Sequence, residues 1–397
     1  MVNGPQAWRM LALVGLAELL GMSPWFSASA VSSSIVAEYH LTTAQAAWLT
    51  MAVQGGFVAG TLVAALLNLS DLVSARWVFG IGCFGAAAAN ALVTAAPSPV
   101  EAVAWRFATG TALALVYPPG MKIVAGWFTS RRGAALGILV ASLTLGKAVP
   151  YLLAAFSGGA WRSMMLMASG LAAAGGLIAI ATVRDGPLAI SGAAFDPRAA
   201  LRVFTRRGTR LGVLGYLGHM WELYAMWTWV GLYVTAALAA RGTASAGRLG
   251  SLAAFAAIGA GAAGAVGAGF IADRRGRANV AAWAMMVSAT CCALTVPAFH
   301  APYGVLLLLV VVWGFSVVAD SAQFSAIVSE TTDDEYLGTA LTVQTCLGFL
   351  LTMVSIRLTS AAAEWVGWQW AFLVILPGPV LGVQAMLALM KPRIQRD

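Results

Sequence analysis

Charged side chains are scarce in this sequence. Asp, Glu, Lys and Arg make up 10% of the 397 residues, whereas 60% are hydrophobic. A soluble domain carries roughly 25% charged residues, so the composition excludes an ordinary globular enzyme or soluble binding domain. The four cysteines all fall in apolar runs and show no disulfide or metal spacing. We therefore expect no metal and no cofactor.

The sequence contains many long apolar runs. A membrane-spanning helix needs roughly 20 mostly apolar residues, and its backbone must be paired internally because hydrocarbon offers no water. We predict an all-α integral membrane protein with twelve transmembrane helices. The predicted spans are about 10–34, 45–67, 77–96, 100–126, 134–156, 163–183, 211–237, 249–271, 280–299, 303–328, 339–361 and 370–390.

A net charge of +8 could suggest a nucleic-acid partner, but its distribution along the chain argues against one. Basic residues are frequent in every second predicted loop. The loops between these carry only Arg162, Arg241 and Arg248, with Arg357 nearby. Because positive loops face the cytoplasm, we predict a multi-pass protein of the inner (cytoplasmic) membrane, in contact with its lipids and with both termini cytoplasmic. The basic residues gather in alternate predicted loops, at Arg76, Arg131, Arg132, Arg198, Arg202, Arg206, Arg207, Arg210, Arg274, Arg275, Arg277, Lys391, Arg393 and Arg396.

Three short motifs occur twice, about 205 residues apart, which indicates an internal repeat. We predict two six-helix bundles related by pseudo-two-fold symmetry, at 1–183 and 211–397, with a cytoplasmic linker at 184–210. In the linker, Asp196-Pro197 favours the start of a short basic amphipathic helix on the membrane surface. A solvated linker is the alternative. The paired motifs are Asp71 to Arg76 with Asp273 to Arg277, Gly133 to Leu136 with Gly338 to Leu341, and Gly159 to Arg162 with Gly367 to Trp370.

These motifs resemble the major facilitator superfamily over essentially the whole chain. GFIADRRGR, from Gly269 to Arg277, matches the family's loop pattern G-x-x-x-D-R-x-G-R, and Arg106 with Gly110 resembles its fourth-helix R-x-x-x-G element. Trp127-Phe128 followed by RGAALG is similar to the nitrate/nitrite, cyanate and monocarboxylate branches. The resemblance implies a secondary transporter, expected as a monomer, whose first, fourth, seventh and tenth spans line a central cavity.

The repeated loop motif predicts a conformational latch. Asp273 can accept hydrogen bonds from a neighbouring helix N-terminus, where the helix dipole favours negative charge. The arginines can pair with acidic groups of the other bundle. A loop that merely sets topology is the alternative, although it does not explain the aspartate and glycine spacing. The predicted latch residues are Asp71, Arg76, Gly269, Asp273, Arg274, Gly276 and Arg277.

Seven ionisable residues fall inside the predicted spans. Such a side chain costs about 2.5–3.5 kcal/mol on insertion scales, so each is a candidate functional residue. Six of the seven fall on the first, fourth, seventh and tenth spans. The seven are Glu18, Arg106, Lys122, Lys147, His219, Glu222 and Asp320.

The stretch LGHMWELYAMWTWVGLY places a histidine and a glutamate in an apolar span. His219 and Glu222 are three residues apart and therefore share a helix face. We predict that this face lines a water-filled cavity; pairing with a neighbouring helix is the alternative. Desolvation disfavours the charged form of a carboxylic acid, so buried carboxylates can exchange protons. The predicted proton-coupling residues are Glu222, Asp320, His219 and Glu18.

Lys147 is expected near the middle of the membrane. An unpaired lysine there is costly, so it needs an anionic ligand or a carboxylate such as Glu18 or Glu222. A substrate could also displace that carboxylate. We favour a fixed cation that binds an anionic substrate. The predicted substrate-binding residues are Lys147, Arg106, Tyr117, Trp221, Tyr224 and Gln323.

The leading hypothesis is a secondary transporter that takes up a small, organic anion together with protons. A proton-driven exporter of amphipathic compounds is the alternative. Gly137, Gly146 and Pro150 keep part of an antiporter pattern, but its final Gly-Pro-x-x-Gly-Gly is missing. An intramembrane enzyme, a haem protein and a non-transporting receptor are weaker hypotheses, since His219-x-x-Glu222 is not HExxH and no nucleotide loop is visible.

Overall fold

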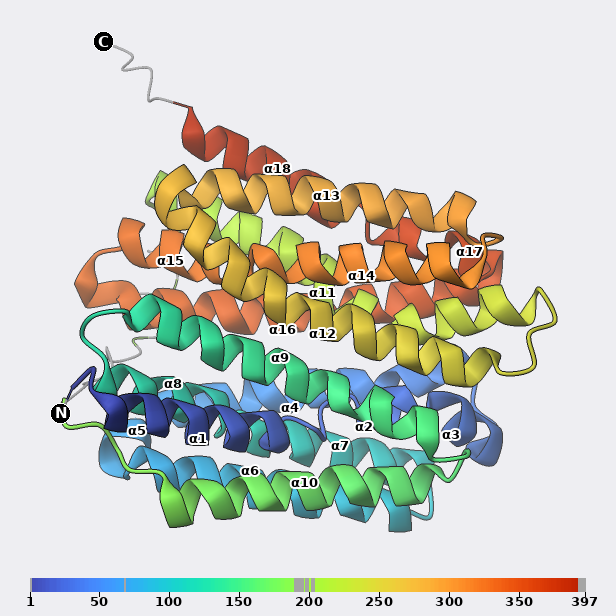
Figure 1. Cartoon of the computed structure of the whole chain (residues 1–397), viewed down its shortest axis with the longest axis horizontal. Coiled ribbons are helices and arrows are strands. Elements are labelled where there is room, and N and C mark those ends of the chain that lie inside the picture. Colours follow the sequence, from blue (N-terminus) through green and yellow to red (C-terminus); the bar gives the residue numbers. More distant parts are fainter. Residues whose placement is uncertain (1, 68, 189–195, 197–199, 201–203, 392–397) are drawn as a thin grey trace.

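The computed structural model describes residues 2–67, 69–188, 196, 200 and 204–391, and the described residues are helical or in turns and loops. Helices from the first half of the chain form one bundle and helices from the second half form another, with both chain ends on the same side (Figure 1). We call this side the terminus side and the opposite one the far side. The predicted linker helix lies on residues that are mostly outside the described part.

The first bundle contains six spans, three of which are straight helices. The other three are interrupted by turns or continued by short helices. The elements are α1 (Pro5–Gly21), α2 (Ser27–Ala30), α3 (Ser32–Tyr39), α4 (Thr43–Leu66), α5 (Leu69–Leu72), α6 (Ala75–Leu92), η1 (Val93–Ala95), α7 (Pro99–Leu113), α8 (Tyr117–Trp127), α9 (Arg132–Phe156) and α10 (Trp161–Thr182).

The second bundle repeats this arrangement. Its first span, α11, is longer than predicted, since it begins at Arg207 rather than at 211. The elements are α11 (Arg207–Ala239), α12 (Ala246–Arg275), α13 (Arg277–Ala298), α14 (Tyr303–Ala319), α15 (Ser321–Thr331), η3 (Asp334–Tyr336), α16 (Leu337–Val366), α17 (Trp368–Ala371), η4 (Phe372–Val374) and α18 (Pro377–Met390).

Local sequence explains where several helices start and stop. Thr42 and Gln45 form a capping box at the start of α4, and the Ser98 hydroxyl accepts from the Glu101 amide at the start of α7. Gly276, in the predicted latch motif, ends α12 with φ +84, a conformation that an L side chain rarely adopts. The motif glycine therefore has a backbone role at this helix boundary.

Nine helical stretches of the described residues are long and apolar enough to cross a membrane. The predicted spans that are not among them are the first, fourth and seventh. The first is interrupted between α1 and α2, and the fourth between α7 and α8, whereas α11 carries His219 and Glu222. A break in the first and fourth spans and buried polar residues in the seventh therefore distinguish these three spans from the nine apolar stretches.

The breaks correct the expectation of continuous first and tenth spans. Pro24 lies in the turn that separates α1 from α2, and Asp320 separates α14 from α15. In the fourth span, the interruption between α7 and α8 precedes Pro118 and Pro119. A proline lacks an amide hydrogen and clashes with the preceding turn, which explains why the first and fourth spans break.

Close helix packing depends on glycine at a few positions. A Cβ on Gly110 of α7 would lie 2.1 Å from the carbonyl oxygen of Val53 on α4. A Cβ on Gly56 of α4 would likewise lie 2.0 Å from the carbonyl oxygen of Phe107. Small residues let membrane helices approach closely, so Gly110 of the R-x-x-x-G element brings α4 against α7.

The two bundles meet along two helix pairs. Helix α9 packs against α12, and α4 packs against α16; the α9–α12 pair crosses the middle of Figure 1. We call this contact region the seam. Side chains that reach the seam belong to both bundles, and their contacts change whenever one bundle moves against the other.

Candidate functional site

Lys147 lies on α9 at the seam and is only 2% exposed. Its Nζ donates a hydrogen bond to the hydroxyl of Tyr224 on α11 at 2.6 Å. The same nitrogen lies 3.9 Å from the ring centre of Trp25 and 5.7 Å from that of Trp227. The amine is therefore enclosed by groups from both bundles.

Aromatic faces, not a counter-charge, surround this lysine. Among the described side chains no carboxylate lies within ion-pair distance of Nζ, so the alternative pairing of Lys147 with Glu18 or Glu222 is not present. A cation over an aromatic face gains about 0.5–2 kcal/mol, depending on how far it is desolvated. These contacts stabilise the charge, and no described carboxylate lies close enough to form an ion pair with it.

A cluster of aromatic rings fills the seam around Lys147. Trp25 lies 5.8 Å from Tyr224 and 5.7 Å from Phe349, measured between ring centres, and Phe57 lies 4.6 Å from Phe349. We call this set the aromatic cage. It consists of Trp25, Phe26 and Phe57 from the first bundle and of Tyr224, Trp227 and Phe349 from the second.

Glu222 faces the interior of the second bundle. Its Oε1 accepts hydrogen bonds from the Ser288 hydroxyl of α13 and the Trp313 indole of α14, each at 2.6 Å. Two donors satisfy a carboxylate oxygen well. Ser288 and Trp313 were not predicted, because an ordinary serine and tryptophan in apolar spans give no signal of their own.

His219 lies beside the break in the tenth span. Its Nδ1 is 2.8 Å from Asp320 Oδ1, and both side chains are buried. Its Nε2 has no hydrogen-bond partner among the described groups. The sequence predicts both residues as proton-coupling residues. Their direct contact follows from the packing of α11 against α14 and α15.

The structure does not bring Lys147, Glu222 and Asp320 into mutual contact. Each has its own buried partners: aromatic rings for the lysine, Ser288 for the glutamate and His219 for the aspartate. In this conformation His219 and Glu222 contact groups of neighbouring helices, and the predicted water-filled cavity stays a prediction.

Glu18 is fully buried on α1, and neither of its carboxyl oxygens has a hydrogen-bond partner among the described residues. Its Oε2 lies against Gly120 of α8, 3.5 Å from the point that a Cβ would occupy. An unpartnered buried carboxylate is costly when charged. Its predicted role in proton coupling stays a prediction.

Arg106 stabilises the break in the first span. Its guanidinium donates to the carbonyl oxygens of Pro24 at 2.8 Å, Trp25 at 2.5 Å and Leu49 at 3.1 Å, and to Asn90 Oδ1 at 2.7 Å. A helix break exposes carbonyl groups that lipid cannot satisfy. Arg106 satisfies them, so in this conformation its nitrogens are occupied by protein groups and do not face a substrate.

We expect Arg106→Ala to destabilise the folded protein by about 3–5 kcal/mol, because it removes a buried hydrogen-bond network. Thermal unfolding in detergent measures the loss. Arg106→Lys restores the charge but not the planar set of donors, and it should recover only part of the stability. Unchanged unfolding of the alanine variant would contradict this structural role.

The remaining predicted substrate residues are dispersed. Trp221 donates through Nε1 to the Val374 carbonyl at 3.1 Å, within its own bundle. Tyr117 is half-buried at the start of α8. Gln323 is buried on α15, and its Oε1 has no partner in the described part of the chain. Of this group, only Tyr224 contacts Lys147.

The predicted latch residues lie on the terminus side. The Arg76 amide donates to Asp185 at 3.2 Å, and Arg277 Nε donates to Glu330 at 2.6 Å. The first contact joins the first bundle to the start of the linker, and the second stays within the second bundle. Gly269, Asp273 and Arg274 are exposed or half-buried at the end of α12, and the side chain of Asp71 lies outside the described residues. A latch across the seam stays a prediction for another conformation.

A contact on the far side joins α3 to α10 within the first bundle. Glu38 accepts from the Arg162 guanidinium, and from the Trp161 indole at 2.6 Å. The hydrogen bond from Arg162, followed by that from Trp161, lowers the pKa of Glu38 below its ordinary value. The pair is exposed and serves to anchor the far-side ends of these helices.

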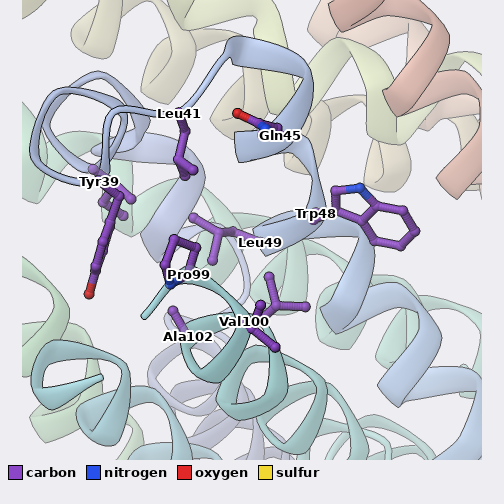
Figure 2. A pocket seen from close by; sticks show the side chains of 10 residues that line it. Tyr39, Leu41, Gln45, Trp48, Leu49, Pro99, Val100 and Ala102 are labelled. Carbon is purple, nitrogen blue, oxygen red and sulfur yellow. The ribbon is translucent and has the colours of Figure 1, made fainter. Parts of the chain in front are cut away.

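An apolar groove of about 370 Å³ lies near the far side, away from Lys147. Figure 2 shows Leu49 and Pro99 next to Val100, with Trp48 further out on one side and Tyr39 on the other. The groove contains no charged side chain. It therefore lacks the chemistry expected of the predicted anion site.

Two helical bundles with buried charged residues near their seam define the fold class of secondary transporters. A model of the Major Facilitator Superfamily matches residues 13–268. This match covers more than half of the chain, and the chain belongs to the major facilitator superfamily. It is a multi-pass membrane transporter of small molecules rather than an enzyme, and its fold is the twelve-helix fold of that family.

Solved structures agree with this fold. The crystal structure of the nucleoside transporter NupG matches with a TM-score of 0.73 at 15% identity, covering 97% of this chain and 100% of that one. A bacterial homologue of the human lysosomal transporter Spinster, in an inward-facing and unoccupied conformation, matches with a TM-score of 0.73 at 15% identity over 100% of both chains. The search of curated proteins gives no match.

Proposed function

We propose that this protein moves a small organic anion across the membrane by alternating access, together with protons. The observation that carries the proposal is Lys147, a buried cation at the seam that has no carboxylate within ion-pair distance in the described part of the chain. An anion that binds there would contact both bundles. Its binding would therefore depend on how the bundles are arranged, as alternating access requires.

The proposed proton sites lie in the interior of the second bundle. His219 contacts Asp320, and Glu222 is held by Ser288 and Trp313. Buried acidic groups of this kind mark proton relays in membrane transporters. Glu18 is the corresponding group of the first bundle.

The proposed orientation follows from the basic loops. It places the terminus side in the cytoplasm and the far side outside the inner membrane. We propose a monomer in contact with membrane lipids, with bundles at 1–183 and 211–397 and a linker at 184–210. The latch would act on the cytoplasmic side.

Hydrogen bonds between the bundles close the far side in this conformation. The Ala44 amide of α4 donates to Glu364 on α16 at 2.8 Å, and the Tyr151 hydroxyl of α9 donates to the Trp227 carbonyl of α11 at 2.6 Å. Glu364 lies in the last turn of α16, where the helix dipole disfavours a negative charge. Its carboxylate also lies at the N-terminus of α4, where the dipole of that helix favours a negative charge.

We therefore expect Glu364→Gln to increase the population with an open far side by about two- to fivefold, since a helix-dipole contact contributes about 0.3–1 kcal/mol. Spin labels at the exposed positions Val100 and Ala244 report the opening as a longer distance in double electron–electron resonance. The control Glu335→Gln removes an exposed glutamate on the opposite side and should change nothing. An unchanged distance distribution in Glu364→Gln contradicts the expectation.

A proton-driven exporter of amphipathic compounds is the second candidate, and the aromatic cage favours it. However, the cage already encloses the amine of Lys147, and a second cation would meet like charge. Uptake into proteoliposomes under an imposed pH gradient separates the two candidates. Accumulation of organic anions supports the proposed symport, whereas efflux of dye-like cations supports the exporter.

A further inference from the structure

We infer that the substrate is a monocarboxylate with a flat aromatic body, bound between Lys147 and the aromatic cage. The inference deepens the proposed function and rests on it. It follows from three independent features of the cage: an excess of hydrogen-bond donors, a single positive charge and ring faces contributed by both bundles.

The cage has donors without acceptors. The indole nitrogens of Trp25 and Trp227 are buried, and neither has a hydrogen-bond partner among the described residues. Lys147 uses one of its three N–H groups on the Tyr224 hydroxyl. Buried donors without acceptors are unfavourable. A carboxylate supplies two acceptor oxygens and the missing negative charge at once.

Among the described residues, Lys147 is the one cation that lies against the cage. Arg106, the other buried basic residue near the first-span break, is occupied by Pro24, Trp25, Leu49 and Asn90. A dianion would keep one charge without a partner in a region that excludes water, which is costly. The charge of the site therefore matches a monoanion.

The rings of the cage can accept a flat body. Phe57 and Phe349 lie against each other across the seam, tilted by 43° with ring centres 4.6 Å apart, and Phe26 stacks on Tyr224 with an interplanar angle of 30°. When the bundles separate, these rings lose their partners from the other bundle. A flat aromatic body can replace those partners in offset or edge-to-face contact, which a saturated ring of similar size does less well.

Four probes test the inference on the purified full-length protein by quenching of tryptophan fluorescence. Benzoate has the inferred charge and shape, cyclohexanecarboxylate keeps the charge but is not flat, terephthalate adds a second carboxylate, and benzyltrimethylammonium reverses the charge. We expect benzoate to bind about tenfold more tightly than either of the other two anions, and the cation not to bind.

Three variants assign the contacts by isothermal titration calorimetry, because tryptophan replacement alters the fluorescence signal. Trp25→Phe keeps a ring but removes the indole N–H, so we expect benzoate to bind about threefold to tenfold more weakly. Trp25→Leu removes the ring as well and should abolish the preference for benzoate over cyclohexanecarboxylate. Trp229→Phe is the matched control, because Trp229 donates to the Ile356 carbonyl outside the cage and should leave benzoate binding unchanged.

The outcomes distinguish the inference from the proposed function. If cyclohexanecarboxylate or terephthalate binds as well as benzoate, and Lys147→Ala weakens them all, the flat monoanion is wrong but an anion transporter remains. If only benzyltrimethylammonium binds, both the inference and the proposed function are wrong. If none of the four probes binds, the inference is overturned.

Discussion

Replacing Lys147 with alanine is expected to lower uptake of organic anions at least about 30-fold, because loss of a desolvated charge partner costs about 2–5 kcal/mol. Folding should survive, since the amine has no ion-pair partner that would be left as an uncompensated charge. The measurement is initial uptake into proteoliposomes at saturating pH gradient, normalised to the amount of reconstituted protein.

Two comparisons make this result specific. Lys391→Ala removes an exposed lysine at the end of α18 and should transport normally. Lys147→Arg retains the charge and should keep more transport than the alanine variant. Normal uptake by Lys147→Ala would remove this residue from the substrate site and with it the main support for an anionic substrate.

Replacing Glu222 with glutamine is expected to uncouple transport from the pH gradient. Glutamine has nearly the same shape and keeps a carbonyl oxygen for the Ser288 and Trp313 donors, but it cannot bind and release a proton. The variant should still exchange substrate across the membrane without a gradient, while accumulation driven by an imposed gradient falls to the level seen without one.

The same assay on two other variants locates the coupling group. Asp320→Asn removes the acidic partner of His219, and Glu18→Gln changes the unpartnered carboxyl group of the first bundle. If Glu222→Gln keeps the normal dependence on the pH gradient, coupling moves to Asp320 or Glu18. Loss of exchange as well as accumulation would instead show that Glu222 has a structural role.

Several features of the site could not be derived from the sequence. Lys147 and Trp25 are far apart along the chain, yet the amine lies 3.9 Å from the ring centre. Arg106 had every sign of a substrate-binding charge, but the break at Pro24 supplies the carbonyl groups that occupy it. Glu364 has no local sequence signal, because its hydrogen bond to α4 depends on how the two bundles pack.

The sequence by itself determined the helical class, the approximate positions of the twelve spans and the family. Hydrocarbon excludes unpaired backbone groups and penalises charge. Membrane spans and rare ionisable residues such as Lys147 can therefore be identified from the local sequence alone. Only the tertiary structure decided which of these residues meet. Contacts across the seam depend on how whole helices pack and where they break, and no local pattern in the chain records that geometry.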